Sequence, residues 1–259
     1  MSDIAIVTGG AGGLGRLLTT ELTRAGLHVV VADRDVTAGQ QVVDEVAAEG
    51  CRATYIETDA SDAHQIQRVV DRAATLGRVA ILINNAGGWL PGAQFPDAEL
   101  STWRRALDLN LAMPMLATQL CVPLMAASGG GAIVNVSSSG GWDSATYGSP
   151  EYGAAKAGLV RFTTSVRDFE PRFGVRVSCV VPHWIGLDRA IQEYEELSPE
   201  ERLASGGLID PTTVVRTVVD LTRDPESAGR VMVVRAGRPP YAVDPASYDP
   251  VESSPHSPN

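Results

Sequence analysis

Short runs rich in valine and isoleucine alternate along this chain with segments whose apolar residues recur at helical spacing. The first three helical segments end at Gly26, Gly50 and Gly77, and glycine commonly ends a helix. This alternation is typical of βαβ units, in which helices cover both faces of a parallel sheet. The predicted strands are Ile4–Val7, Leu27–Ala32, Ala53–Ile56, Val79–Ile83, Ala132–Val136, Val175–Val181 and Val231–Val234.

The chain has 259 residues, of which 44% are hydrophobic and 20% charged, a composition typical of globular proteins. No linker rich in proline, glycine or serine interrupts the first 235 residues. We therefore predict one α/β domain over residues 1–237, with a doubly wound parallel sheet of about seven strands. Residues 238–259 are rich in proline and are expected to form an extended or disordered tail, or an arm against a neighbouring subunit.

The 21 Lys and Arg residues against 31 Asp and Glu residues give a net charge of −10. Because phosphate contacts need clustered basic side chains, this balance argues against nucleic acid and anionic membranes as partners. The three cysteines are far apart, which implies neither a disulfide framework nor a metal site. No signal-peptide pattern follows Met1, and polar residues and prolines interrupt the apolar stretch 107–127. We expect a cytoplasmic protein without a membrane span.

A glycine-rich string lies between the first predicted strand and the first predicted helix and reads Thr8-Gly9-Gly10-Ala11-Gly12-Gly13-Leu14-Gly15. Glycines at this junction let the backbone approach a pyrophosphate, and the helix N-terminus offers it free N–H groups. A glycine string alone could be a flexible turn, but its place between strand and helix predicts a dinucleotide site. The expected cofactor contacts are Thr8, Gly9, Gly13, Leu14 and Gly15.

Asp33 ends the second predicted strand, about 18 residues after Gly15. An acidic residue at this spacing accepts hydrogen bonds from the adenosine ribose and repels a 2′-phosphate. Arg34 could pair with such a phosphate, but the glycine string has no basic residue to assist it. We therefore predict NAD rather than NADP as the cofactor. Asp59, at the end of the third strand, is placed to hydrogen-bond adenine; taken alone, it would be a turn residue or a helix cap.

Three further motifs follow in order: Asn84-Asn85-Ala86-Gly87 after the fourth strand, Ser137-Ser138-Ser139 after the fifth, and Tyr152-Gly-Ala-Ala-Lys156 at the start of the next helix. With the glycine string, they make residues 3–237 resemble the short-chain dehydrogenase/reductase family. Around Gly207–Pro211 the chain weakly resembles the 15-hydroxyprostaglandin dehydrogenase branch. The resemblance implies a Rossmann-like fold, nicotinamide-dependent oxidoreductase activity on CH–OH groups, and cofactor contacts from Ala60, Asn85, Ala86 and Gly87.

Tyr152 and Lys156 are four residues apart in a predicted helix, so their side chains share one helix face. A phenol has an unperturbed pKa of about 10 and is a poor base at neutral pH. A nearby ammonium group favours the phenolate and lowers the pKa of the phenol toward the working range, as general acid–base catalysis requires. The spacing alone would also suit a surface pair. Together with the other motifs, it predicts a catalytic pair.

The family resemblance implies roles for three more groups. Lys156 would also bind the nicotinamide ribose, a serine would hold the substrate oxygen, and Asn110 would anchor a proton-relay water. Counting from the fifth strand places the serine at Ser138, whereas counting back from Tyr152 by the family's more usual spacing gives Ser139. We favour Ser138 and infer one extra residue in the loop.

The segment after the sixth strand departs from the family pattern and reads Pro182-His183-Trp184-Ile185-Gly186-Leu187. Pro182 and Ile185 keep the places from which the family holds the nicotinamide carboxamide. His183 replaces a glycine, and Leu187 stands where a threonine hydroxyl would contact the nicotinamide amide. The departure concerns contacts at the nicotinamide end of the cofactor rather than the chemistry.

A substrate loop is expected over about residues 183–208, with a short lid helix over residues 188–205. Aromatic residues gather in the loops around the expected site, which predicts an apolar or aromatic substrate pocket. Each of them could instead cap the core. The predicted substrate contacts, besides Ser138, are Trp89, Trp142, Tyr147, His183 and Trp184.

The helices predicted over Leu100–Ala127 and Tyr152–Phe169 carry more apolar residues than one sheet face needs, and the resemblance makes them a subunit interface. We therefore expect a homodimer or homotetramer. The expected activity is hydride transfer between NAD(H) and a secondary alcohol or ketone. Reduction of an imine or enone is one alternative, and a non-catalytic NAD-binding regulatory protein is another. No sequence feature names the substrate.

Overall fold

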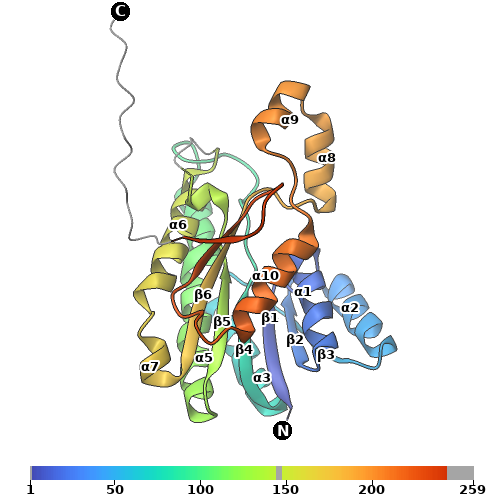
Figure 1. Ribbon diagram of the computed structural model, residues 1–259, viewed down its shortest axis with the longest axis vertical. Coiled ribbons are helices and arrows are strands. Elements are labelled where there is room, and N and C mark those ends of the chain that lie inside the picture. The colour runs from blue at the N-terminus through green and yellow to red at the C-terminus, as the bar shows by residue number, and fades with distance from the viewer. Residues whose placement is uncertain (1, 144–147, 244–259) are drawn as a thin grey trace, which may run out of the picture.

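The computed structural model describes residues 2–143 and 148–243. They form one sheet with the strand order β3-β2-β1-β4-β5-β6-β7-β8 (Figure 1). β1 to β7 are parallel, and β8 pairs antiparallel with β7. The strands are β1 (Asp3–Thr8), β2 (His28–Asp33), β3 (Arg52–Glu57), β4 (Arg78–Asn84), β5 (Gly131–Val136), β6 (Val175–Pro182), β7 (Val231–Val234) and β8 (Tyr241–Val243).

Helices cover both faces of this sheet, as Figure 1 shows. Besides the α-helices, the structure has two short helical segments: the π-helix η1 (Asp108–Ala112) and the 3₁₀ turn η2 (Ser139–Gly141). The α-helices are α1 (Gly13–Arg24), α2 (Val36–Ala48), α3 (Ala63–Leu76), α4 (Leu100–Leu107), α5 (Met113–Ala127), α6 (Pro150–Ser165), α7 (Phe169–Phe173), α8 (Asp188–Glu196), α9 (Pro199–Ser205) and α10 (Pro211–Arg223).

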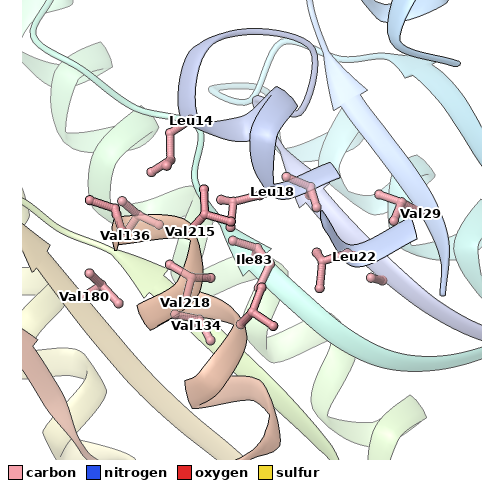
Figure 2. Packing of buried hydrophobic residues seen from close by; sticks show 14 of the residues in the cluster. Leu14, Leu18, Leu22, Val29, Ile83, Val134, Val136, Val180, Val215 and Val218 are labelled. Atoms are coloured by element: carbon pink, nitrogen blue, oxygen red, sulfur yellow. The ribbon is translucent and has the colours of Figure 1, made fainter. Parts of the chain in front are cut away.

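Alternate residues of each strand point to opposite faces of a sheet, and here they build two apolar layers. Ala5 and Val7 of β1 belong to the layer formed with α1, α2 and α10, part of which is shown in Figure 2. Ile4 and Ile6 belong to the layer formed with α3 and α5. Burial of a side chain of this size contributes about 1.5–3 kcal/mol. The two layers hold the carboxyl ends of the central strands in place, and the candidate site lies there.

The seven strands predicted from apolar runs are confirmed to within about two residues at either end, the usual uncertainty of element boundaries. β8 was not predicted: it lies in the proline-rich segment expected to be a tail, and it forms the edge of the sheet. The rest of that segment, residues 244–259, lies outside the described residues. The predicted lid helix is two helices, α8 and α9, because Ser198 and Glu201 form a capping box that starts α9.

The predicted helix Leu100–Ala127 is continuous but contains the π-helical turn η1 between α4 and α5. By length and composition alone it could cross a membrane, and it is the one such helix among the described residues. Ala117, Cys121 and Met125 of α5 are buried against the sheet and α3. This half of the helix therefore covers one face of the sheet.

Candidate active site

The order of the strands reverses at β1, so the crevice at the carboxyl ends of β1 and β4 is where an open α/β sheet binds ligands. A cavity of about 1040 Å³ opens there, large enough for an extended dinucleotide. It brings together predicted site residues from the ends of β1, β2, β3 and β4. They are Gly9, Asp33, Arg34, Asp59, Ala60, Ala86, Gly87 and Trp89.

The glycine string forms a tight loop between β1 and α1. Gly9 has a φ of 63°, which L-residues other than glycine rarely adopt. A side chain at Gly15 would overlap the carbonyl oxygen of Gly9, so only glycine allows this turn. Gly12 precedes α1 without a side-chain cap, and the first N–H groups of the helix remain available to an anion. The loop therefore fits a pyrophosphate.

Thr8, the last residue of β1, and Asn85, which follows the neighbouring strand β4, hold this loop in place. The Thr8 hydroxyl accepts hydrogen bonds from the N–H groups of Asn85 and Ala86, both at 3.1 Å. The Asn85 side chain donates to the carbonyl oxygens of Thr8 and Gly9, both at 3.0 Å. Thus two motifs that are more than 70 residues apart in sequence form one rigid wall of the cavity.

Asp33 and Asp59 lie at the expected adenosine end of the cavity. The Asp33 carboxylate accepts hydrogen bonds from the N–H groups of Ala11 at 3.0 Å and Asp35 at 3.1 Å. These bonds fix the carboxylate at the cavity wall and leave it further acceptor sites. The Asp59 carboxylate accepts from Ser61 and pairs with Arg105 at 3.1 Å, and these contacts hold the pKa of Asp59 below its usual range.

Lys156 and Asn110 both lie beside Gly87, which lines the cavity. The Lys156 ammonium group is buried and donates to the Val136 carbonyl oxygen at 2.8 Å. A side chain at Gly87 would come within 2.7 Å of Asn110 Oδ1 and 2.9 Å of Lys156 Nζ. These polar groups therefore converge on the backbone at Gly87, where the absence of a side chain allows their close approach.

The π-helical turn η1 presents Asn110. Its amide group donates to the carbonyl oxygens of Ala106 and Gly88 and accepts from the N–H of Gly88 at 2.9 Å. Gly158 of α6 lies against the Leu111 side chain, so the turn approaches the helix that carries Lys156. π-Helical turns occur frequently at functional sites. The turn thus places Asn110 against the backbone at Gly87 and Gly88, near Lys156.

Tyr152 and Lys156 lie on the same face of α6, with Lys156 Nζ 5.7 Å from the centre of the Tyr152 ring. Burial lowers the pKa of Lys156 to about 8. Near neutral pH the ammonium group is still mostly protonated, and it favours the phenolate form of a nearby tyrosine. The pair can therefore exchange a proton with a ligand oxygen.

The three serines after β5 have different surroundings. Ser137 is buried and donates to the Lys156 carbonyl oxygen at 2.8 Å, so its hydroxyl holds the β5 end against α6. Ser138 is half-buried, continues the extended backbone of β5, and accepts from the Gly140 N–H at 3.2 Å. Ser139 begins η2, and its carbonyl oxygen accepts from the N–H groups of Trp142 and Asp143. Both candidates for the catalytic serine thus stand beside α6.

The segment after β6 keeps part of the expected arrangement. Ile185 forms an isolated parallel bridge with Ile209, which fixes its backbone near the start of α10. Leu187 packs into the apolar layer near Gly13 rather than offering a hydroxyl. His183 donates its N–H to the Val234 carbonyl oxygen and turns its ring toward Asp143.

The predicted aromatic contacts do not gather in one place. Trp89 lines the large cavity and is 41% exposed. Trp184 packs edge to face on Tyr194 of α8, with ring centres 5.8 Å apart. Trp142 packs on the apolar cluster between α6, β6 and β7. This packing is what we expect of a residue that caps the core. Tyr147 lies outside the described residues.

Two arginines that the sequence analysis did not select also line the large cavity. Arg105 of α4 pairs with Asp59, and the Arg189 guanidinium group of α8 lies 5.3 Å from the centre of the Trp89 ring. Arg189 Nε also donates a hydrogen bond to Glu193 Oε1 at 2.6 Å. No local signal separates either arginine from an ordinary solvated helix residue, because their role depends on the packing of distant segments.

Comparison with known proteins agrees with this geometry. Residues 3–196 match the family model for short chain dehydrogenase. The cis-4-hydroxycyclohexanecarboxylate dehydrogenase of Sinomonas cyclohexanicum is 31% identical over 240 residues, which cover 90% of this chain and 95% of that protein.

Two solved structures share the fold over most of their length. A 7α-hydroxysteroid dehydrogenase complexed with NADH and 7-oxo glycochenodeoxycholic acid has a TM-score of 0.82 and 26% identity, covering 92% of this chain and 94% of that one. An actinorhodin polyketide ketoreductase with NADPH has a TM-score of 0.80 and 27% identity, and the match covers 91% of this chain and 97% of that one. Their cofactors are nicotinamide dinucleotides, which the glycine loop and the cavity described above also fit. The chain belongs to the short-chain dehydrogenase/reductase family.

Proposed function

We propose that the protein transfers a hydride between NAD(H) and a secondary alcohol or ketone. The observation that carries the proposal is the convergence of Lys156, Asn110 and Gly87 at the inner end of the dinucleotide cavity, next to Tyr152 and the serine turn. The cofactor supplies the hydride acceptor or donor when bound. The protein supplies the binding loop, the proton-transfer group and the groups that position them.

The proposed roles follow from these contacts. Tyr152 takes the hydroxyl proton of the alcohol, or returns it to the ketone oxygen, and Ser138 holds that oxygen by a hydrogen bond. Lys156, fixed by the Val136 carbonyl oxygen, lowers the pKa of Tyr152 electrostatically and binds the nicotinamide ribose. Asn110 positions the water that relays the proton. Positioned acid–base groups of this kind contribute about 10²- to 10⁴-fold to a rate.

The substrate is expected to carry its alcohol on an apolar ring. The Sinomonas relative is named for a ring alcohol, and the steroid dehydrogenase structure holds an oxo steroid acid. Trp89 and Trp184 place apolar surface near the cavity and the lid. Reduction of an imine or enone uses the same proton donor and is the second candidate. A non-catalytic NAD sensor is less favoured, because a sensor would not need Tyr152, Lys156 and Asn110 together.

NAD(H) is expected to be preferred over NADP(H) in kcat/KM. A 2′-phosphate would lie beside the Asp33 carboxylate, and like charges in a partly desolvated site cost about 1–4 kcal/mol. This cost corresponds to about 10- to 1000-fold discrimination. We expect the lower half of that range, because Arg34 also lines the cavity. Kinetics with both cofactors measure the preference.

The variant Asp33→Ser should narrow or reverse this preference. Asp35→Asn is a matched control, because Asp35 caps α2 and removing its charge leaves the cavity wall intact. Equal or better use of NADPH by the unaltered protein would show that Arg34 outweighs Asp33.

Ser138→Ala is expected to lower kcat/KM by about 10-fold or more, the usual effect of losing a hydrogen bond to a developing charge. Ser139→Ala removes the neighbouring hydroxyl and should have the smaller effect. Parallel kinetics of the two variants decide between the two serines. A larger loss in Ser139→Ala would move the substrate contact to that residue.

We further infer a homodimer or homotetramer formed through α4, α5 and α6, and a cytoplasmic location. Leu100 and Met115 support the first inference, because they are 47% and 41% exposed on the helix that carries Asn110. Sedimentation that finds a lone 27.3 kDa species would contradict the oligomer.

A further inference from the structure

A second cavity, of about 570 Å³, lies beside the proposed reaction centre and is lined mostly by polar and charged groups. Its walls come from three segments that follow the site: the loop after the serine turn, the residue after β6, and the turn between β7 and β8. The end of α9 forms the fourth side. The charged and titratable lining residues are Asp143, His183, Arg235 and Arg238.

This cavity adjoins the serine turn. The Asp143 N–H donates to the Ser139 carbonyl oxygen at 2.8 Å, so Asp143 closes the turn that begins at Ser138. His183 directly follows Pro182, the last residue of β6, and its N–H donates to the Val234 carbonyl oxygen at the end of β7. A substrate whose oxygen is held by Ser138 can therefore extend toward these side chains.

The lining has an excess of positive charge although the whole chain is acidic. Two guanidinium groups, those of Arg235 and Arg238, face one carboxylate, that of Asp143. Burial, together with the nearby charge of Arg235, lowers the pKa of His183, so the imidazole is neutral near pH 7. The four side chains together carry one formal positive charge, in a chain whose net charge is −10.

The donors of this cluster are only partly used by the protein. Arg235 Nη2 donates to Asp143 Oδ1 at 2.9 Å, but Arg235 Nε has no hydrogen-bond partner among the described residues. His183 Nε2 lies 3.7 Å from Asp143 Oδ2. Like Arg235 Nε, it is shielded from solvent and has no hydrogen-bond partner among the described residues. Arg238 donates to the Tyr241 hydroxyl at 3.0 Å. Guanidinium groups bind carboxylates through paired N–H donors.

We propose that this cavity binds a carboxylate group of the substrate, with Arg238 and Arg235 as its partners, so that the protein acts on a hydroxy or oxo acid. This inference rests on the proposed function and deepens it by naming a substrate class. A single negative charge matches the single excess positive charge of the lining. The arginines would then hold the acidic end of the molecule whose alcohol or ketone oxygen Ser138 holds.

A matched pair of probes tests the proposal: cis-4-hydroxycyclohexanecarboxylate and its methyl ester, each oxidised with NAD⁺. The acid should have a kcat/KM about 10-fold or more above that of the ester, because charge-assisted hydrogen bonds are stronger than neutral ones. Arg238→Met should lower the ratio of acid to ester by about 10-fold, through the KM of the acid. Arg216→Met, an exposed arginine of α10, is the control and should leave the ratio unchanged.

A third variant, Asp143→Asn, separates recognition from a merely structural role. It removes the carboxylate that competes for Arg235 and should raise the ratio of acid to ester, whereas a structural role predicts a loss for both probes. An ester used as well as the acid, or an Arg238→Met variant that lowers both equally, would overturn the proposal and leave the proposed function intact.

Binding of cyclohexanecarboxylate and cyclohexanecarboxamide, measured by calorimetry with NADH present, decides the question without turnover. The carboxylate should bind about 10-fold or more tightly, and Arg238→Met should remove the difference. Equal binding of the two would reject the carboxylate site. If the carboxylate binds selectively but neither alcohol is oxidised, the proposed oxidoreductase function fails and the anion site stands.

Discussion

Replacing Tyr152 with phenylalanine is expected to lower kcat by about 10²- to 10⁴-fold, with the affinity for NADH close to that of the unaltered protein. The phenol is the proton-transfer group, and its ring lies 5.7 Å from Lys156 Nζ on one face of α6. Phenylalanine keeps the ring and its packing but has no hydroxyl. Steady-state kinetics give kcat, and quenching of tryptophan fluorescence by NADH gives the affinity.

A matched control is Tyr194→Phe, which removes a hydroxyl from α8 and keeps the ring that packs on Trp184. It should have far less effect on kcat. Turnover at the unaltered rate in Tyr152→Phe would rule out Tyr152 as the proton-transfer group.

The second large effect is expected for Lys156→Met, which should abolish most activity and weaken NADH binding while making the cofactor-free protein more stable. Lys156 is buried, and its burial lowers its pKa from the ordinary 10.5 to about 8. A lowering of this size corresponds to about 3 kcal/mol at about 1.4 kcal/mol per pKa unit. Methionine avoids this cost but loses the bond to Val136, worth about 1 kcal/mol.

The burial of Lys156 also makes the free energy of unfolding depend on pH in a definite direction. Between pH 8 and 10.5 the unfolded chain keeps the Lys156 proton that the folded chain has released, so the free energy of unfolding rises with pH in this window. Below pH 8 both states are protonated, and the full cost of burying the charge is present. The methionine variant lacks this contribution. It should therefore be more stable than the unaltered protein by about 1–3 kcal/mol at pH 7, with a smaller difference at pH 10.

Urea unfolding of the two cofactor-free proteins at pH 7 and pH 10 measures both differences. A methionine variant less stable at pH 7, or a difference that does not change with pH, would contradict the buried charge. Gain of stability with loss of activity is the expected signature of a catalytic group that is costly to bury.

Much of the fold follows from local patterns. The apolar runs placed seven strands because parallel strands covered on both faces are apolar throughout, and the glycine string placed the start of α1. The string also located the dinucleotide crevice, since the tight turn at Gly9 and Gly15 leaves no room for other residues. Asn110, Tyr152 and Lys156 were predicted from family motifs, and the structure brings Asn110 and Lys156 together at Gly87.

Features that depend on distant packing were not predicted. β8 lies in a segment whose prolines predicted a tail, but its residues Tyr241 and Val243 pair with β7 and make β8 the edge strand. Trp142, a predicted substrate contact, packs on an apolar cluster that its sequence neighbours do not indicate. The cluster of Asp143, His183 and Arg235 joins segments that no sequence spacing connects, because only the parallel order of β5, β6 and β7 brings their ends together.

The central claim is hydride transfer to a carbon–oxygen double bond, with the proton supplied by Tyr152. The most direct test supplies NADH carrying deuterium at the transferable position, with 4-oxocyclohexanecarboxylate and cyclohexanone as acceptors, to the unaltered protein and to Tyr152→Phe. We predict that the unaltered protein places deuterium on the carbinol carbon of the alcohol product and that the variant forms almost none. No deuterated alcohol from either ketone, or equal amounts from both proteins, would contradict the account.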